Sequence, residues 1–159
     1  MRALFAIVAL SVLAGCQTDA ARGQPKTIAR FYLESSDARA VSVVLPNSGI
    51  TLALAATPAL TEGDIVNVEV VQVELGRCLM FELTPSATRD LYRFTASNQG
   101  RRLVLTINGA AFGARRIDGP IADGRLFVFV EMADNALLAL VANLKTTSAE
   151  LQRAAAKRK

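Results

Sequence analysis

The sequence predicts an α+β domain, and three observations support this prediction. Short segments in which apolar and polar residues alternate are typical of half-buried strands. Short stretches of turn-forming residues separate several of these segments. Two further segments repeat their apolar residues at helical spacing. With 159 residues, 52% of them hydrophobic, the chain is long enough for one domain with its own core.

Five strands are expected in the first half of the domain. Pro46-Asn47-Ser48-Gly49 has the composition of a turn and predicts a hairpin. Gly76-Arg77 predicts a two-residue connection in a second hairpin. A change of apolar parity at Val70–Val71 predicts a β-bulge or a strand that is covered on both faces. The expected strands are residues 28–34, 41–45, 50–54, 65–75 and 78–83.

The second half of the domain predicts two helices and three strands. Thr84 as N-cap and Pro85 in the first turn predict the start of a helix that ends at Gly100. Asn108-Gly109 is a strong hairpin signal between two of the expected strands, which are residues 101–107, 110–117 and 126–130. Asp134 is expected to cap a last helix with the apolar stripe Leu137, Leu138, Val141 and Leu144. This order predicts two helices packed on one face of a mainly antiparallel, ferredoxin-like sheet.

Residues 1–15 are typical of an export signal. Arg2 precedes an apolar run from Ala3 to Ala14, which as a helix would span about 18 Å, well short of the roughly 30 Å core of a bilayer. The run ends in Leu13-Ala14-Gly15-Cys16, which resembles the lipobox of bacterial lipoproteins. The resemblance implies cleavage before Cys16 and acylation of Cys16, which would anchor the protein in membrane lipid. The alternative is a plain secretory signal with a chance cysteine.

Polar segments are expected on both sides of the domain. Residues 16–27 are small and polar and would tether the lipidated cysteine to the domain. Gln17 stands where some lipoproteins carry an aspartate that retains them in the inner membrane, so the resemblance favours the outer membrane, facing the periplasm. The basic tail, residues 146–159, either contacts anionic lipid or an acidic partner, or is a frayed, solvated end. Charge gathered in a tail does not indicate a nucleic-acid surface.

The composition argues against an enzyme. The chain has no His, which excludes His-based triads and His metal sites, and it has no Gly-x-Ser-x-Gly or phosphate-binding motif. Once Cys16 is acylated, Cys78 is the remaining thiol, and its place in an apolar strand predicts an inert side chain over a reactive one. We therefore expect no catalytic residues, no cofactor and no metal.

Four motifs carry a resemblance to a known family. Leu60-Thr61-x-x-Asp64-Ile65 comes first, and Thr95-x-x-Asn98-x-Gly100-Arg101-Arg102-Leu103-Val104-Leu105, Asn108-Gly109 and Pro120-Ile121-x-x-Gly124-Arg125 follow in order. Together they resemble the head subdomain of the first periplasmic domain of the translocase subunit SecD, over residues 28–144. The glycines and asparagines in these motifs suit tight turns, so the resemblance implies fold more directly than function.

The resemblance implies contact with an extended or unfolded polypeptide, through a sheet edge or a groove beside the loop of residues 118–124. Arg115 and Asp123 depart from the family pattern, which has Pro and Gly there, and with Arg116 and Asp118 they are the candidate partner-contact residues. SecD proteins also carry several transmembrane helices that couple proton flow to movement of the head. After the signal, no segment reaches the ~18 apolar residues that a span needs, so that role is not expected here.

These observations predict a membrane-anchored periplasmic binding module with its domain at residues 28–145. The expected partners are exported polypeptides, or a membrane protein of the translocase or the envelope. The alternative is a structural envelope lipoprotein that docks on a membrane-protein partner. For Arg115-Arg116 two interpretations remain: the pair binds an anion, or it is a charged strand edge that discourages aggregation, which is the commoner role of such a pair.

Overall fold

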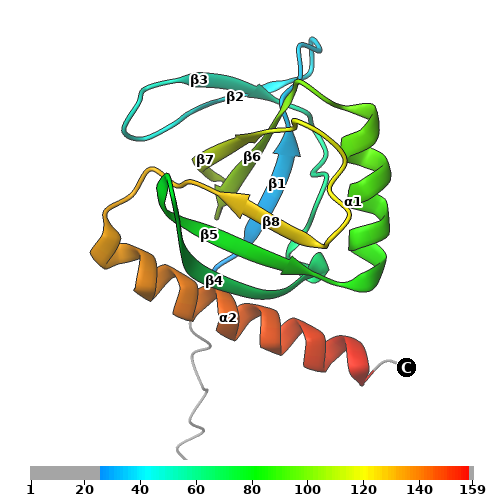
Figure 1. Cartoon of the computed structure of the whole chain (residues 1–159), viewed down its shortest axis with the longest axis vertical. Coiled ribbons are helices and arrows are strands. Elements are labelled where there is room, and N and C mark those ends of the chain that lie inside the picture. Colours follow the sequence, from blue (N-terminus) through cyan, green and yellow to red (C-terminus); the bar gives the residue numbers. More distant parts are fainter. Residues whose placement is uncertain (1–25, 158–159) are drawn as a thin grey trace, which may run out of the picture.

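The computed structural model describes residues 26–157, which form eight strands, two α-helices and one turn of 3-10 helix (Figure 1). The strand order along the chain agrees with the α+β prediction. The elements are β1 (Ala29–Leu33), β2 (Val41–Val44), β3 (Thr51–Leu54), η1 (Glu62–Asp64), β4 (Ile65–Val73), β5 (Gly76–Leu83), α1 (Pro85–Ser97), β6 (Arg102–Ile107), β7 (Ala110–Arg116), β8 (Arg125–Val128) and α2 (Asp134–Ala156).

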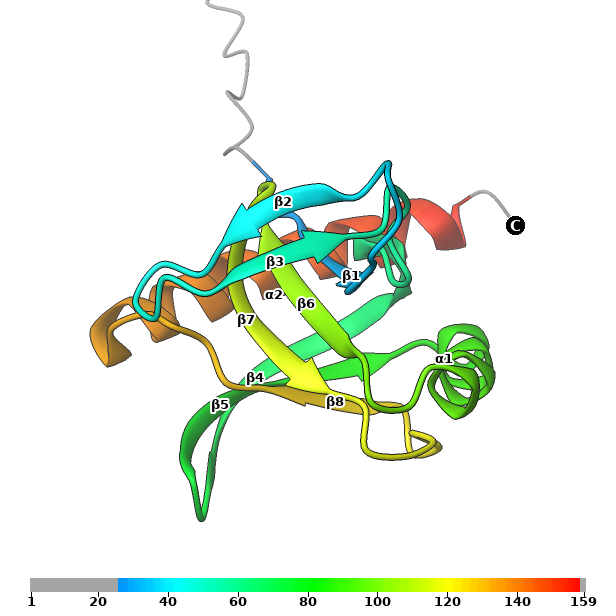
Figure 2. The same cartoon turned by 90° about the horizontal axis from the view of Figure 1, so that it is seen from above.

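The strands form three antiparallel sheets where the sequence predicted one. The sheets have the orders β1-β6-β7, β2-β3 and β4-β5-β8, so a ferredoxin-like arrangement is not confirmed. The helices also do not share one face, because α2 packs along β4 while α1 lies at a different side of the molecule (Figures 1 and 2). The strands divide into separate sheets because each three-stranded sheet buries one apolar face by packing against the other.

The main core lies between the two three-stranded sheets. Phe31 of β1 and Phe81 of β5 meet there edge to face, with ring centroids 5.0 Å apart, and both are fully buried. Leu91 of α1 and Leu137 of α2 close the sides of this core. Burial of an aromatic side chain of this size contributes on the order of 2–3 kcal/mol, and the edge-to-face contact adds to it.

A second, smaller core holds the β2–β3 hairpin on the outer face of β6 and β7. Leu52 and Leu54 of the hairpin pack with Val104 of β6 and Ala111 of β7. Figure 2 shows the hairpin crossing over β6 and β7. The hairpin is also joined to β1, since the N–H of Ala55, the residue after β3, donates to the Leu33 carbonyl at 2.9 Å. This second core fixes the hairpin as one wall of the cleft described below.

The predicted start of α1 and the predicted β6–β7 turn are confirmed, but α1 ends at Ser97 with Asn98 as its C-cap, earlier than the predicted end at Gly100, whose φ of 83° belongs to the loop that follows. The Thr84 hydroxyl accepts the Ala87 N–H at 3.2 Å, and Pro85 begins α1. Asn108 and Gly109 have φ of 50° and 87°, which is the left-handed backbone that a two-residue hairpin of this kind requires.

The β4–β5 hairpin differs from its prediction in two places. Val73 pairs with Gly76, so the turn residues are Glu74 and Leu75. The turn therefore lies two residues earlier in the chain than the predicted Gly76-Arg77. The irregularity in β4 lies between Ile65 and Asn67 instead of at Val70–Val71. Both differences arise because the register with β5 is set by which side chains reach the core, and turn composition alone does not determine it.

The last helix also differs from its prediction. Its N-cap is Ala133, and Asp134 lies inside the helix, where its carboxylate pairs with Arg77 at 3.2 Å. Leu137, Val141 and Leu144 of the predicted stripe are buried, but Leu138 is 69% exposed. Leu138 therefore lies outside the buried face of α2.

Most of the predicted basic tail belongs to α2; its first part packs on the domain, and residues 153–157 are exposed. The helix runs to Ala156, and Thr147 and Ser148 are buried. The Gln152 side chain donates to the carbonyls of Gly63 and Ile65, both at 3.3 Å. The Thr27 N–H donates to the Thr147 hydroxyl at 3.2 Å, so the end of the predicted tether also contacts α2.

The expected signal and lipidation site lie outside the described residues, since residues 1–25, with Cys16 and Gln17, and residues 158–159 are not among them. Within residues 26–157, neither helix is both long enough and apolar enough to cross a bilayer.

Candidate functional site: a cleft at two open strand edges

Among residues 26–157, strands β7 and β8 each have one partner, so each leaves its other edge without a ladder. The Phe112 carbonyl points away from β6 and accepts the Glu131 N–H at 2.7 Å. Beyond the bulge at Phe112, the N–H of Ile117, the residue after β7, donates to the carbonyl of Arg101, the residue before β6, so Ile117 points toward that strand. Because backbone groups alternate in direction along a strand, those of Arg116 and Ala114 point away from β6. Within residues 26–157 no further strand pairs with this outer edge.

The two edges meet at Gly113 and separate beyond it. A Cβ on Gly113 would lie 2.2 Å from the Phe129 carbonyl oxygen, so only glycine permits this approach of β7 to the chain after β8. Further along, Arg115 bridges the strands, and one guanidinium N–H donates to the Phe127 carbonyl at a long 3.4 Å. β7 and the chain after β8 therefore lie against each other at Gly113, and an opening lies further along between the strands.

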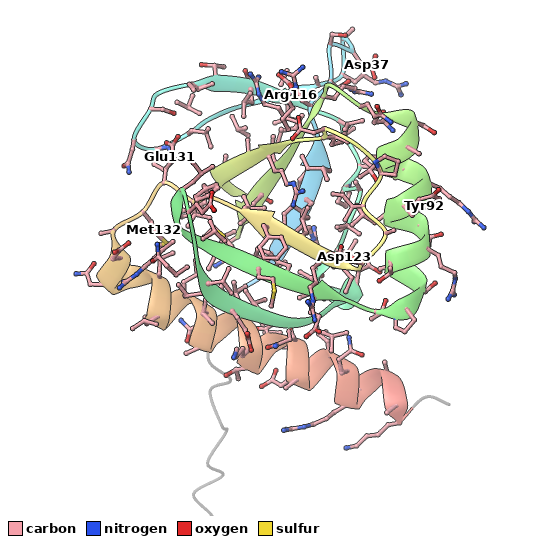
Figure 3. All side chains as sticks on the ribbon, in the orientation of Figure 1. Asp37, Tyr92, Arg116, Asp123, Glu131 and Met132 are labelled. Carbon is pink, nitrogen blue, oxygen red and sulfur yellow. The ribbon has the colours of Figure 1, made fainter. Side chains whose placement is uncertain are left out.

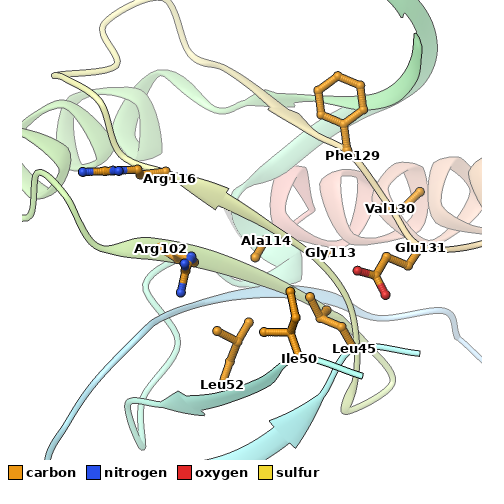
Figure 4. Close-up of a pocket in the computed structure, with 10 residues that line it drawn as sticks. All are labelled: Leu45, Ile50, Leu52, Arg102, Gly113, Ala114, Arg116, Phe129, Val130 and Glu131. Atoms are coloured by element: carbon orange, nitrogen blue, oxygen red, sulfur yellow. The ribbon is translucent and has the colours of Figure 1, made fainter. Parts of the chain in front are cut away.

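Two adjoining cavities follow this opening, and we call them together the edge cleft. One has a volume of about 460 Å³ and is closed on one side by the β2–β3 hairpin (Figure 4). The other, about 340 Å³, lies between β7 and β8 and shares Ala114, Arg116 and Phe129 with the first. The residues that line the edge cleft are Leu45, Ile50, Leu52, Arg102, Gly113, Ala114, Arg115, Arg116, Asp118, Phe127, Phe129, Val130 and Glu131.

The edge cleft is apolar in its middle and charged at its ends. Ile50 is 50% exposed and Phe129 is 42% exposed, which is high for side chains of this kind. Arg102 and Arg116 lie at one end and Glu131 lies at the other (Figure 4). An open strand edge beside exposed apolar side chains is the arrangement by which domains bind extended peptides.

The carboxylate at the closed end is already bound within the chain. One oxygen of Glu131 accepts the N–H groups of Asn47 and Ser48 at 2.8 and 2.9 Å. Hydrogen bonds hold the pKa of Glu131 below its usual range. The largest contribution comes from the Ser48 side chain, followed by the Ser48 N–H and the Asn47 N–H. These bonds join the hairpin turn to the chain after β8, so they close this end of the cleft.

Three of the four predicted contact residues line the edge cleft. Arg115, Arg116 and Asp118 lie together there, and the Arg116 Nε is 3.8 Å from an Asp118 oxygen. Asp123 lies elsewhere (Figure 3), and its carboxylate accepts the Arg125 N–H at 3.1 Å in a local turn. A role for Asp123 in the same contact is therefore not supported by its position.

Sequence reasoning missed the apolar walls and the closed end. Ile50 and Leu52 come from an early hairpin, and Phe129 and Glu131 follow the last strand. Only tertiary folding brings these segments to β7. One signal was available in the sequence. Leu45 and Ile50 flank the Pro46–Gly49 turn, and two apolar residues so close to the tip are unusual in a solvated hairpin.

The described residues show no arrangement for metal binding. Within residues 26–157 no three His, Cys, Asp or Glu side chains gather in a way that would hold a metal ion. Cys78 is a free, fully buried thiol, and burial raises its pKa, which fits the expectation of an unreactive side chain.

The fold and the edge cleft define an antiparallel α+β domain with open strand edges, and solved structures of SecDF share this fold. SecDF in its super-membrane-facing form matches with a TM-score of 0.60 and 14% identity, over 75% of this chain and 18% of that chain. SecDF described as a membrane component that enhances protein export matches at 0.60 and 15%, over 76% and 62%. SecDF from Thermus thermophilus, a translocon-associated membrane protein, matches at 0.53 and 17%, over 76% and 20%.

These matches confirm, at the level of fold, the resemblance to SecD that the sequence motifs indicated. This chain spans less than two thirds of the length of each of these SecDF chains. No family model and no curated protein matches the chain.

Proposed function

We propose that the protein is a lipid-anchored periplasmic module that binds extended segments of exported polypeptides in its edge cleft. The observation that carries this proposal is the open edge of β7, where the backbone groups of Ala114 and Arg116 point into a cleft with apolar walls. The lipobox-like leader supports export and anchoring through Cys16. The similarity to SecDF, which enhances protein export, supports an exported polypeptide as the bound partner, which we call the client.

An unfolded client fits this cleft better than a folded one. A segment that adds to β7 needs free backbone N–H and C=O groups, and in a folded protein those groups are mostly paired. Exposed apolar side chains of the segment would then contact Ile50 and Phe129, both about half exposed in the free protein. Backbone bonds supply affinity without sequence preference, which suits a protein that meets many exported chains.

A photo-crosslinking amino acid at position 114 tests the proposal. In the full chain, the probe in place of Ala114 is expected to capture an unfolded exported polypeptide and not its folded form. The matched control is the same probe in place of Ala139, an exposed residue of α2 outside the edge cleft. Equal capture of folded and unfolded client, or equal capture from both positions, would contradict binding at the edge cleft.

Ala114→Pro gives a second test with a separate readout. The Ala114 N–H points away from β6, and proline is tolerated on an edge strand where its missing N–H faces outward. The variant is expected to keep its melting temperature within a few degrees and to lose roughly tenfold in client affinity, because a backbone donor at the open edge is gone. Unchanged affinity would argue against pairing with β7.

A second candidate function is docking on a membrane-protein partner, and exposed leucines favour it. Leu75, at the tip of the β4–β5 hairpin, is 85% exposed, and Leu138 of α2 is 69% exposed. The two elements are joined by the ion pair of Arg77 and Asp134. In a pull-down from solubilised membranes, one stoichiometric partner that is lost in the double variant Leu75→Ser, Leu138→Ser would favour this function.

A further inference from the structure

Arg102 and Arg116 stand directly opposite one another in β6 and β7. Because the backbone of Arg116 points away from β6, this is a non-hydrogen-bonded pair, in which facing side chains approach most closely. Like charges placed directly opposite each other destabilise a sheet. The domain therefore keeps an unfavourable pair of positive charges at the open end of the edge cleft.

The surrounding carboxylates compensate only one of the two arginines. The Arg102 guanidinium donates to the Glu34 carboxylate at 3.0 Å. The Arg116 Nε is 3.8 Å from Asp118, beyond hydrogen-bond distance, and both side chains are largely exposed. An exposed pair at this separation contributes little. Among the described residues, the Arg116 guanidinium has no hydrogen bond to another group.

Protection of the strand edge against aggregation does not explain the pair. Charged side chains discourage pairing with another chain when they lie on the outer strand of a sheet. Arg102, however, lies on β6, which is paired on both sides, by β1 and by β7. Its position adds repulsion at the cleft without protecting an edge.

We infer that Arg102 and Arg116 form a carboxylate-binding end of the edge cleft, so that the bound segments carry an acidic group next to their apolar residues. This inference rests on the proposed function and specifies its substrate class. A carboxylate between two guanidinium groups accepts charge-assisted hydrogen bonds from both and relieves their repulsion. Ile50, Leu52 and Phe129 line the same cavity and contact the apolar residues of the segment.

The opposite end of the cleft fixes the orientation of the segment. Glu131 lies there, and its carboxylate is held by the N–H groups of Asn47 and Ser48. A second carboxylate at that end would meet like charge, so an acidic group is accepted only at the arginine end. The cleft thereby distinguishes the two directions of a segment that has acid at one end and apolar residues at the other.

Peptide binding to the full chain in detergent micelles tests the inference. The probe is a fluorescent peptide with four apolar residues followed by one Glu, amidated at its C-terminus, and the matched peptide carries Gln in place of Glu. We expect the Glu peptide to bind roughly tenfold more tightly, because hydrogen bonds to charged groups are the strong ones. A third peptide, with Gln and a free C-terminus, distinguishes a side-chain carboxylate from a chain-terminal one.

The charge-reversal variant R116E gives the decisive comparison. It places opposite charges across the β6–β7 pair, so the fold is expected to be at least as stable as that of the parent. The preference for Glu over Gln is expected to disappear, and a Lys peptide is expected to bind best. R89E, on the exposed face of α1, makes the same charge change outside the cleft and is expected to keep the preference of the parent.

The outcomes separate the inference from the proposed function. Equal binding of the Glu and Gln peptides, with Ala114→Pro still weakening both, overturns the carboxylate site and leaves polypeptide binding in place. Loss of the Glu preference in both R116E and R89E also overturns it, since net charge alone would then explain the effect. If none of the peptides binds, both the inference and the proposed function fail.

Discussion

Gly113→Ala is expected to separate β7 from the chain after β8 and to destabilise the fold. The added Cβ would lie 2.2 Å from the Phe129 carbonyl oxygen, whereas ordinary contact begins at 3.4 Å, so the backbones must move apart by about 1.2 Å. The neighbouring hydrogen bond from Glu131 N–H to the Phe112 carbonyl, 2.7 Å long, would stretch beyond its useful range.

The cost follows from these two effects. Overpacking against backbone costs about 1–3 kcal/mol, and the lost hydrogen bond adds about 1 kcal/mol. The total of about 2–4 kcal/mol lowers the melting temperature by roughly 10 °C in a domain of this size. Differential scanning calorimetry of the parent and the variant measures this change in melting temperature directly.

Gly119→Ala is the matched control for this variant. Gly119 follows β7 closely in the chain, but no atom lies within 4 Å of a Cβ at this position and its φ is not positive. Its melting temperature is expected to change by the equivalent of less than about 0.5 kcal/mol. Equal midpoints for Gly113→Ala and the parent would refute the close approach of β7 to the chain after β8 at Gly113.

Three further outcomes are expected. Cys16→Ser should abolish labelling by a fatty-acid probe and release the protein from membranes, whereas continued labelling would show modification elsewhere. Gly109→Val should cost more than about 1 kcal/mol, because a β-branched residue is strained at a φ of 87°, and an unchanged denaturation midpoint would contradict this. The lowered pKa of Glu131 means that its bonds stabilise the hairpin above the ordinary glutamate pKa and are lost as the pH falls through the folded value. The protection factors of the Asn47 and Ser48 amides, which compare the observed exchange with the intrinsic rate at each pH, should therefore fall on acidification in the parent and stay nearly constant in Glu131→Gln; the same fall in both proteins would exclude this contact.

Local signals in the sequence were sufficient for most elements. The Thr84-Pro85 start of α1 and the Asn108-Gly109 turn are confirmed, because both depend on the conformational preferences of the residues themselves. Turn composition was less reliable in the β4–β5 hairpin, where Gly76 lies in a strand and Leu75 in the turn. There, cross-strand packing of the core residues outweighed the local preference.

The candidate site was only partly predictable. Arg115 and Asp123 were expected because they depart from the family pattern, and Arg116 and Asp118 were grouped with them. Arg115, Arg116 and Asp118 do line one cleft, whereas a local turn directs Asp123 away from it. The pairing of Arg116 with Arg102 depends on strand register, which the spacing of the sequence does not give.

The sequence alone determined the α+β class, most strand and helix positions, and the lipobox-like leader, because each follows from residues within a few positions of one another. Tertiary structure decided the division into three sheets, the approach of β7 to Phe129 at Gly113 and the opposite ends of the edge cleft. Apolar surface can be buried in several strand arrangements with the same local pattern. Which one forms depends on contacts between segments far apart in the chain.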